Sequence, residues 1–138
     1  MREKKEDWRS VALRALKLGF NENEEPSESI EKINQSMLLF SSIIDSGEVD
    51  EPWPYIKYAG LLSCFIRHQE NKEEHEWKKV ELYKKAYLIE KNTFSCLGLL
   101  DTFLRLNLLL DALSWLKELG ELDPNNQYIE FYFKKIIP

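Results

Sequence analysis

Histidine residues are the first candidates for chemistry in this chain, and their spacing does not favour a metal site. His68 and His75 flank a charged stretch that the sequence predicts to be a loop. A tetrahedral zinc site needs four ligands, and no cysteine or paired histidine accompanies these two. We therefore expect a solvated loop here and no metal ligand.

The cysteine thiols and the acidic side chains do not indicate a catalytic site either. Cys64 and Cys96 lie inside apolar helical patterns, which predicts buried free thiols in a reducing compartment; a disulfide or a metal pair is the alternative. Asp101 and Glu118 could form an acid–base pair, but most acidic helical proteins offer such pairs. No glycine-rich phosphate loop, Gly-x-Ser-x-Gly elbow or His-Glu-x2-His motif is present. The sequence predicts neither catalysis nor a bound cofactor.

Length and charge narrow the class of protein. At 138 residues the chain has the size of one domain. A net charge of −5 disfavours nucleic-acid binding, which requires a basic face. The charged first residues do not resemble a signal peptide, and no apolar run is long enough to span a bilayer. We expect a cytoplasmic protein that contacts neither nucleic acid nor membrane.

The elements that must position any site are helices. Apolar side chains recur at i, i+3, i+4 and i+7, and no long stretch alternates with the period of a strand. Ser27 is the predicted cap of the second helix, Asn71 that of the fourth, and Asp123-Pro124 is expected to open the seventh. The pattern predicts an all-α fold with helices over about 4–20, 26–46, 54–68, 72–91, 94–107, 109–121 and 125–137.

The stretch from 96 to 126 carries a repeat motif. Cys96-x2-Leu99-Leu100-x2-Phe103, then Ala112-x3-Leu116, then Pro124 resembles the tetratricopeptide repeat. The match is specific in 77–126 and looser upstream. It implies an α-solenoid of about three helical hairpins, over about 4–46, 53–91 and 94–121, followed by a terminal helix. A generic helical bundle is the alternative.

The resemblance also implies a binding groove, because the first helices of successive hairpins line the concave face in that family. Leu13, Gly60, Phe94 and Gly98 stand where relatives that clamp chaperone tails carry polar or basic groups, so that activity is not expected. A mixed apolar and basic surface suits an amphipathic helix or an extended peptide. The alternative is that Phe94, Leu97 and Leu104 are covered by the last helix or a neighbouring repeat. The predicted set, which we term the first-helix surface, is Arg9, Leu13, Lys17, Trp53, Ile56, Lys57, Phe94, Leu97, Asp101, Leu104 and Arg105.

The last helix is unusually aromatic. Tyr128, Phe131, Tyr132 and Phe133 leave little polar surface, which predicts deep packing together with self-association into a homodimer. The sequence as a whole predicts a non-catalytic protein-interaction module, either an adaptor or a protein similar to small acidic secretion chaperones, whose partner is a protein or peptide. A structural subunit assembled through the last helix is one alternative, and an enzyme is another.

Overall fold

The computed structural model of this chain describes residues 7–66 and 72–137, and within them the regular structure is helical apart from one isolated bridge. The prediction of an all-α fold with seven helices is confirmed in this part. None of the helices described there has both the length and the hydropathy needed to cross a membrane. The helices are α1 (Trp8–Gly19), α2 (Ile30–Asp45), α3 (Trp53–Ile66), α4 (Lys72–Ile89), α5 (Thr93–Arg105), α6 (Leu109–Leu122) and α7 (Ile129–Ile136).

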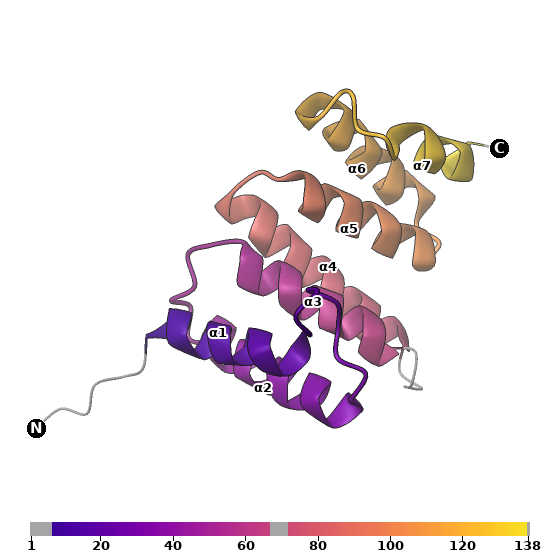
Figure 1. Cartoon of the computed structure of the whole chain (residues 1–138). Coiled ribbons are helices and arrows are strands. Elements are labelled where there is room, and N and C mark those ends of the chain that lie inside the picture. Colours follow the sequence, from indigo (N-terminus) through magenta and orange to yellow (C-terminus); the bar gives the residue numbers. More distant parts are fainter. Residues whose placement is uncertain (1–6, 67–71, 138) are drawn as a thin grey trace, which may run out of the picture.

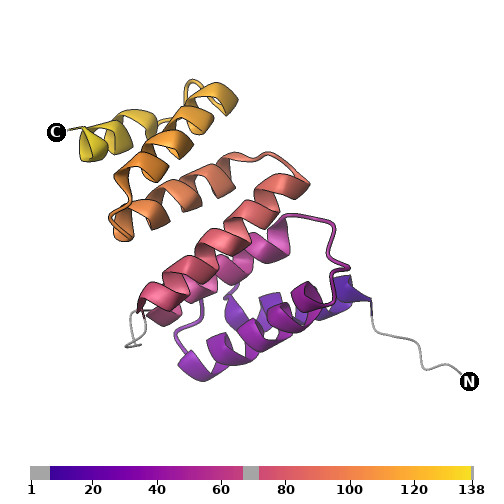
Figure 2. The same cartoon turned by 180° about the vertical axis from the view of Figure 1, so that it is seen from behind.

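The helices follow one another in an extended stack. Each helix packs against the next along the chain, and α1 also reaches α3. The two opposite views place α1 and α3 on one face (Figure 1) and α2 and α4 on the other (Figure 2). The described chain therefore begins and finishes at opposite ends of the stack (Figure 1).

Two clusters of buried apolar side chains form the core. The first joins α1, α2 and α3, and the second joins α5 and α6 with the end of α7. Helix α4 contributes to both clusters. Leu82 belongs to the first cluster, Val80 belongs to the second, and Tyr83 packs against each. Because α4 is covered on two sides, its charged residues Glu76 and Lys79 are buried as well.

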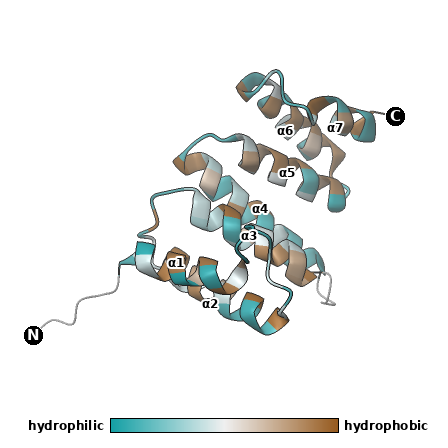
Figure 3. Ribbon diagram, in the orientation of Figure 1, coloured by the Kyte–Doolittle hydropathy of each residue, from teal (hydrophilic) through white to brown (hydrophobic). Residues whose placement is uncertain are grey.

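Alanines mark the places where helices approach closely. Ala12, Ala59, Ala86 and Ala112 have no exposed surface. A small side chain lets two helix backbones come together, while large neighbours fill the space around the crossing. Ala112, which belongs to the repeat motif of the last hairpin, is buried between α5 and α6. Hydrophobic segments accordingly recur along all the helices (Figure 3).

The start of α2 differs from the prediction. Ser29 caps this helix, its side chain accepting from the Lys32 amide at 3.3 Å, so the predicted cap at Ser27 is wrong. The Ser27 amide instead donates to the Gly19 carbonyl oxygen at 2.7 Å, and Phe20 pairs with Pro26. These backbone contacts hold the connection in a turn and delay the helix.

The start of α7 is also later than predicted. Asp123 closes α6, since its amide donates to the Leu119 carbonyl oxygen at 2.8 Å. The Asn126 amide then donates to the Asp123 carbonyl oxygen at 3.0 Å, and the Tyr128 amide donates to Asn126 Oδ1 at 2.9 Å. A turn therefore occupies the segment after Pro124, and the expectation that Asp123-Pro124 opens the last helix is wrong. The predicted cap at Asn71 lies outside the described residues.

Candidate protein-binding groove

The residues selected for chemistry do not converge on one site. His75 lies within α4, inside the helix predicted over 72–91 and not in the solvated loop expected between the two histidines. Its ring is 5.5 Å from that of Phe65 in an edge-on contact. Its sequence partner His68 lies outside the described residues. In the described ranges, no group of three or more histidine, cysteine or acidic side chains is placed to hold a metal ion.

The thiols and the two candidate carboxylates are separately engaged. Cys64 and Cys96 are free, and burial raises the pKa of the Cys96 thiol to about 11, with the nearby Glu118 carboxylate acting in the same direction. A thiol with so high a pKa is a poor nucleophile at neutral pH. Asp101 accepts from Arg105 Nε at 2.9 Å, whereas Glu118 accepts from the Tyr87 hydroxyl.

The members of the first-helix surface on α1 and α3 lie together. Trp8 and Trp53 have ring centroids 6.4 Å apart. Lys17 and Lys57 line a cavity of about 260 Å³, in which the Lys57 ammonium stands 4.9 Å above the Phe20 ring. This part of the surface therefore offers a smaller cavity, beside which Lys57 already contacts Phe20.

Charge pairing occupies much of the rest of that region. Arg9 lies 3.8 Å from Asp7, 3.6 Å from Asp50 and 3.3 Å from Glu51, and its guanidinium stacks on the Trp8 ring. Leu13, by contrast, is 52% exposed and stands on the outer side of α1. Ile56 of α3 is only half-buried and packs against the first core cluster.

The α5 members of the first-helix surface make different contacts. Leu104 is half-buried against the second core cluster, as is Tyr132 of α7. Asp101 and Arg105 pair with each other, and Leu97 is half-buried. Phe94 remains 72% exposed, so the last helix does not cover it.

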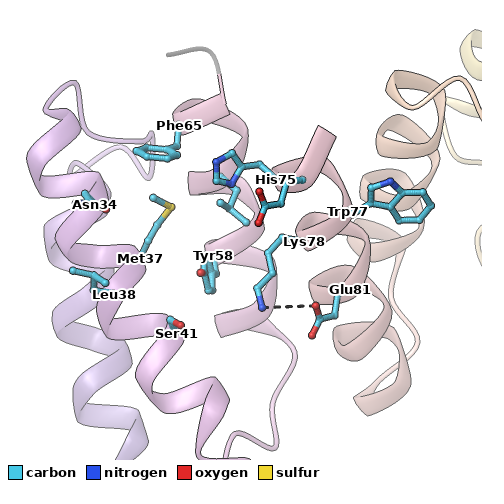
Figure 4. Close-up of a pocket in the computed structure, with 12 residues that line it drawn as sticks. Asn34, Met37, Leu38, Ser41, Tyr58, Phe65, His75, Trp77, Lys78 and Glu81 are labelled. Carbon is cyan, nitrogen blue, oxygen red and sulfur yellow. Dashed lines mark ion pairs between the residues drawn. The ribbon is translucent and has the colours of Figure 1, made fainter. Parts of the chain in front are cut away.

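A groove lies on the other face of the stack. It has a volume of about 520 Å³ and runs between α2 and α4 above the surface of α3 (Figure 4). We term it the α2–α4 groove. Its lining residues are Asn34, Met37, Leu38, Ser41, Tyr58, Leu62, Phe65, Glu74, His75, Trp77, Lys78 and Glu81.

The floor of the α2–α4 groove is apolar and packs against the first core cluster. Met37 and Leu62 are buried members of the first core cluster. Tyr58 stacks on Phe40 with ring centroids 6.4 Å apart, and burial raises the pKa of its phenol, although contact with Ser41 opposes the shift. A phenol with a raised pKa stays neutral, so the floor carries no charge at neutral pH.

The rim of the groove combines an exposed leucine with paired charges. Leu38 is 65% exposed on the α2 side. On the α4 side, Lys78 Nζ lies 3.7 Å from Glu81 Oε2, and Lys85 pairs with the same carboxylate at 3.2 Å. Trp77 points from α4 toward α5 rather than across the groove (Figure 4), with its ring 6.2 Å from that of Phe103. The groove therefore presents apolar side chains on its floor, an exposed leucine on the α2 rim and paired charges on the α4 rim.

Sequence reasoning missed this groove. One signal was available, because Met37, Leu38, Leu39 and Phe40 form a continuous apolar run that is wider than the buried stripe of an amphipathic helix requires. Met37 and Phe40 are buried, but Leu38 stands outside that stripe. Whether Leu38 borders a groove depends on how α4 packs, and this packing is a property of the tertiary structure.

Searches against protein-family models, curated proteins and solved structures found no match for this chain.

Proposed function

We propose that this chain is a non-catalytic interaction module of the tetratricopeptide-like type, and that it binds an apolar segment of a partner protein in the α2–α4 groove. The observation that carries the proposal is the groove itself, with a neutral apolar floor and an exposed leucine at its rim. Monomeric proteins seldom expose apolar surface in a concave site without a binding role. The proposed site is thus formed mainly by second helices of hairpins rather than by the first-helix surface.

Two features support the repeat interpretation. The chain packs helix to helix in sequence order, with alternate helices of the first two hairpins on opposite faces (Figures 1 and 2). Small residues stand at the crossing inside the last hairpin, as in the resembling family. Each hairpin then buries its apolar face against the next, which is how helical repeats form a continuous core.

An amphipathic helix fits the groove better than a larger apolar surface does. The lining residues span 34–41 on α2 and 74–81 on α4, which at 1.5 Å per residue gives walls roughly 10 Å long. That length accommodates about two helical turns of a partner, whose apolar residues at i, i+3, i+4 and i+7 would contact the floor. The paired charges on the α4 rim suit a partner helix with polar flanks.

The proposal includes a cytoplasmic location. Its support is that both cysteines, Cys64 and Cys96, are free thiols, which is the usual state in a reducing compartment.

Substitution of Leu38 by lysine is expected to weaken partner binding at least tenfold. The change places a charge at the rim of the α2–α4 groove, where an apolar side chain of the partner would otherwise be desolvated. The binding segment is first isolated by co-purification with the wild-type chain, and its affinity for each variant is then measured by calorimetry. Leu38 is 65% exposed, so the folded state should be unaffected.

Leu13→Lys is the matched control, because Leu13 is also an exposed leucine and lies on the first-helix surface. Its affinity for the segment should stay within about twofold of wild type. If Leu13→Lys abolishes binding while Leu38→Lys does not, the first-helix surface is the site and the groove proposal is wrong.

A further inference from the structure

Exposed apolar side chains concentrate at the C-terminal part of the stack. Of the fifteen large apolar side chains that are exposed in the described part of the chain, eight belong to residues 109–137. Both α6 and α7 accordingly show hydrophobic segments (Figure 3). Proteins seldom expose this much apolar surface in one region without an interaction role, so this concentration indicates a contact surface.

The exposed leucines near the start of α6 lie on the side that faces away from the preceding hairpin. Trp115 and Glu118 contact Tyr87 of α4, with the two rings 5.1 Å apart. Leu109 and Leu113 are spaced by four residues and, at 100° per residue, fall on a different side of α6. They are 45% and 39% exposed. Leu110, next to them, is 84% exposed.

Helix α7 divides into an inner and an outer side. Ile129, Tyr132 and Ile136 pack against the second core cluster. The residues one position after each of these three, together with Lys134, are all exposed, and they form an outward stripe. The stripe consists of Glu130, Phe133, Lys134 and Ile137.

The four aromatic residues predicted for self-association do not share one surface. Tyr132 belongs to the inner side of α7. Phe131 lies 5.1 Å from the Tyr132 ring and has the Lys135 ammonium 4.4 Å from its own centroid. Phe133 alone among them belongs to the outward stripe, while Tyr128 stands at the start of the helix and is 44% exposed.

We propose that a second copy of this chain docks on the outer surface of α6 and α7, forming a two-fold symmetric dimer. We define this surface as the α6–α7 patch, consisting of Leu109, Leu110, Leu113, Phe133 and Ile137. It is separate from the α2–α4 groove, so the two sites can be tested independently.

The size of the α6–α7 patch matches what a dimer requires. Its five side chains are 39–84% exposed, which at roughly 180 Å² for a large side chain amounts to roughly 500 Å² of apolar surface. A standard interface covers about 800 Å² on each partner and is about 60% apolar, so it too contains roughly 500 Å² of apolar surface per partner. The patch is therefore large enough to form the centre of such an interface.

The charges beside the patch are self-complementary. Glu130 and Lys134 lie on the same outward stripe, with the acid nearer the start of α7 and the base nearer its end, and they pair within the helix at 3.1 Å. A two-fold axis perpendicular to α7 reverses the direction of the second α7, and this arrangement brings the acidic end of each helix toward the basic end of the other. The same surface can thus bind itself with opposite charges facing each other.

The test is sedimentation velocity on the full chain from about 1 to 200 µM. Wild type is expected to show a reversible monomer–dimer equilibrium within this range. Leu110→Lys should raise the dimer dissociation constant at least tenfold, because each dimer loses two buried leucines. Leu88→Lys is the matched control, since Leu88 of α4 is 83% exposed and lies outside the patch. The dimer dissociation constant of this variant should stay within twofold of the wild-type value.

A charge-reversal series adds a test that a general loss of stability would not mimic. Glu130→Lys should weaken the dimer about threefold, and Glu130→Lys combined with Lys134→Glu should restore it. Circular dichroism checks that all variants keep wild-type helicity. A wild-type chain that stays monomeric at 200 µM overturns the proposal, as does a dimer that Leu110→Lys and Leu88→Lys affect equally. Leu38→Lys should leave the dimer intact. A failure of the dimer proposal can therefore be distinguished from a failure of the groove proposal.

Discussion

Replacing Glu76 with alanine is expected to lower the free energy of unfolding by about 3–5 kcal/mol. Glu76 is 7% exposed and Lys79 is 2% exposed, and the Lys79 ammonium lies 3.5 Å from Glu76 Oε2. Burial lowers the pKa of Lys79, while the Glu76 carboxylate opposes that shift. Removing the carboxylate leaves a buried ammonium without this counterion, and urea unfolding followed by circular dichroism measures the loss.

A double variant separates the destabilisation caused by an unpaired buried charge from the contribution of the intact ion pair to the free energy of unfolding. Glu76→Leu with Lys79→Met should be as stable as wild type or slightly more stable, because apolar side chains of similar volume avoid the desolvation of both ions. If the double variant is as unstable as Glu76→Ala, the pair itself stabilises the fold and the interpretation is wrong.

An exposed ion pair on the same helix provides the control. Lys85 lies 3.2 Å from Glu81, and both side chains are about half exposed, at 47% and 49%. Lys85→Ala should change the free energy of unfolding by less than about 0.5 kcal/mol, since water solvates each ion well. Comparing the loss of stability at the two pairs shows whether the effect depends on burial of the ions or on their charge alone.

Gly98→Ala is expected to destabilise the fold by about 2 kcal/mol. A Cβ atom at this position would lie 2.4–2.6 Å from the ring atoms of Tyr83, and such overpacking costs about 3 kcal/mol. Alanine favours a helix over glycine by about 1 kcal/mol, so the clash outweighs the gain. Tyr83→Leu removes the ring, and the cost of Gly98→Ala should be smaller in that background.

The same substitution at open helical positions should have the opposite sign. A Cβ atom at Gly60 of α3 or Gly120 of α6 would meet no heavy atom within 4 Å. Gly60→Ala and Gly120→Ala are therefore expected to stabilise the fold by up to about 1 kcal/mol. Stabilisation by Gly98→Ala as well would show that α4 and α5 do not approach as closely as described.

The number and order of helices could be predicted because they depend on local signals. Apolar periodicity and breaks such as Ser46-Gly47 or Pro52 are properties of adjacent residues, and they placed every helix near its observed position. The predicted caps at Ser27 and Asp123 were wrong because backbone bonds within the connections compete with helix initiation. Sequence composition alone does not reveal that competition.

The burial of α4 and the position of the groove could not be predicted in the same way. Helix α4 is packed between α3 and α5, which buries Glu76 and Lys79, whereas Leu88 is 83% exposed. Leu38 and Tyr58 belong to different hairpins and meet in the α2–α4 groove only after these hairpins pack. Packing between hairpins is not encoded by periodicity within one helix.

Site-specific photocrosslinking in the native host can show whether the α2–α4 groove binds the proposed partner. A benzophenone amino acid replaces Leu38 in one variant and Leu13 in another, and mass spectrometry maps the adducts. We expect position 38, and not position 13, to crosslink to one amphipathic segment of one partner protein. Crosslinking of a defined partner segment from position 13 alone would contradict this expectation.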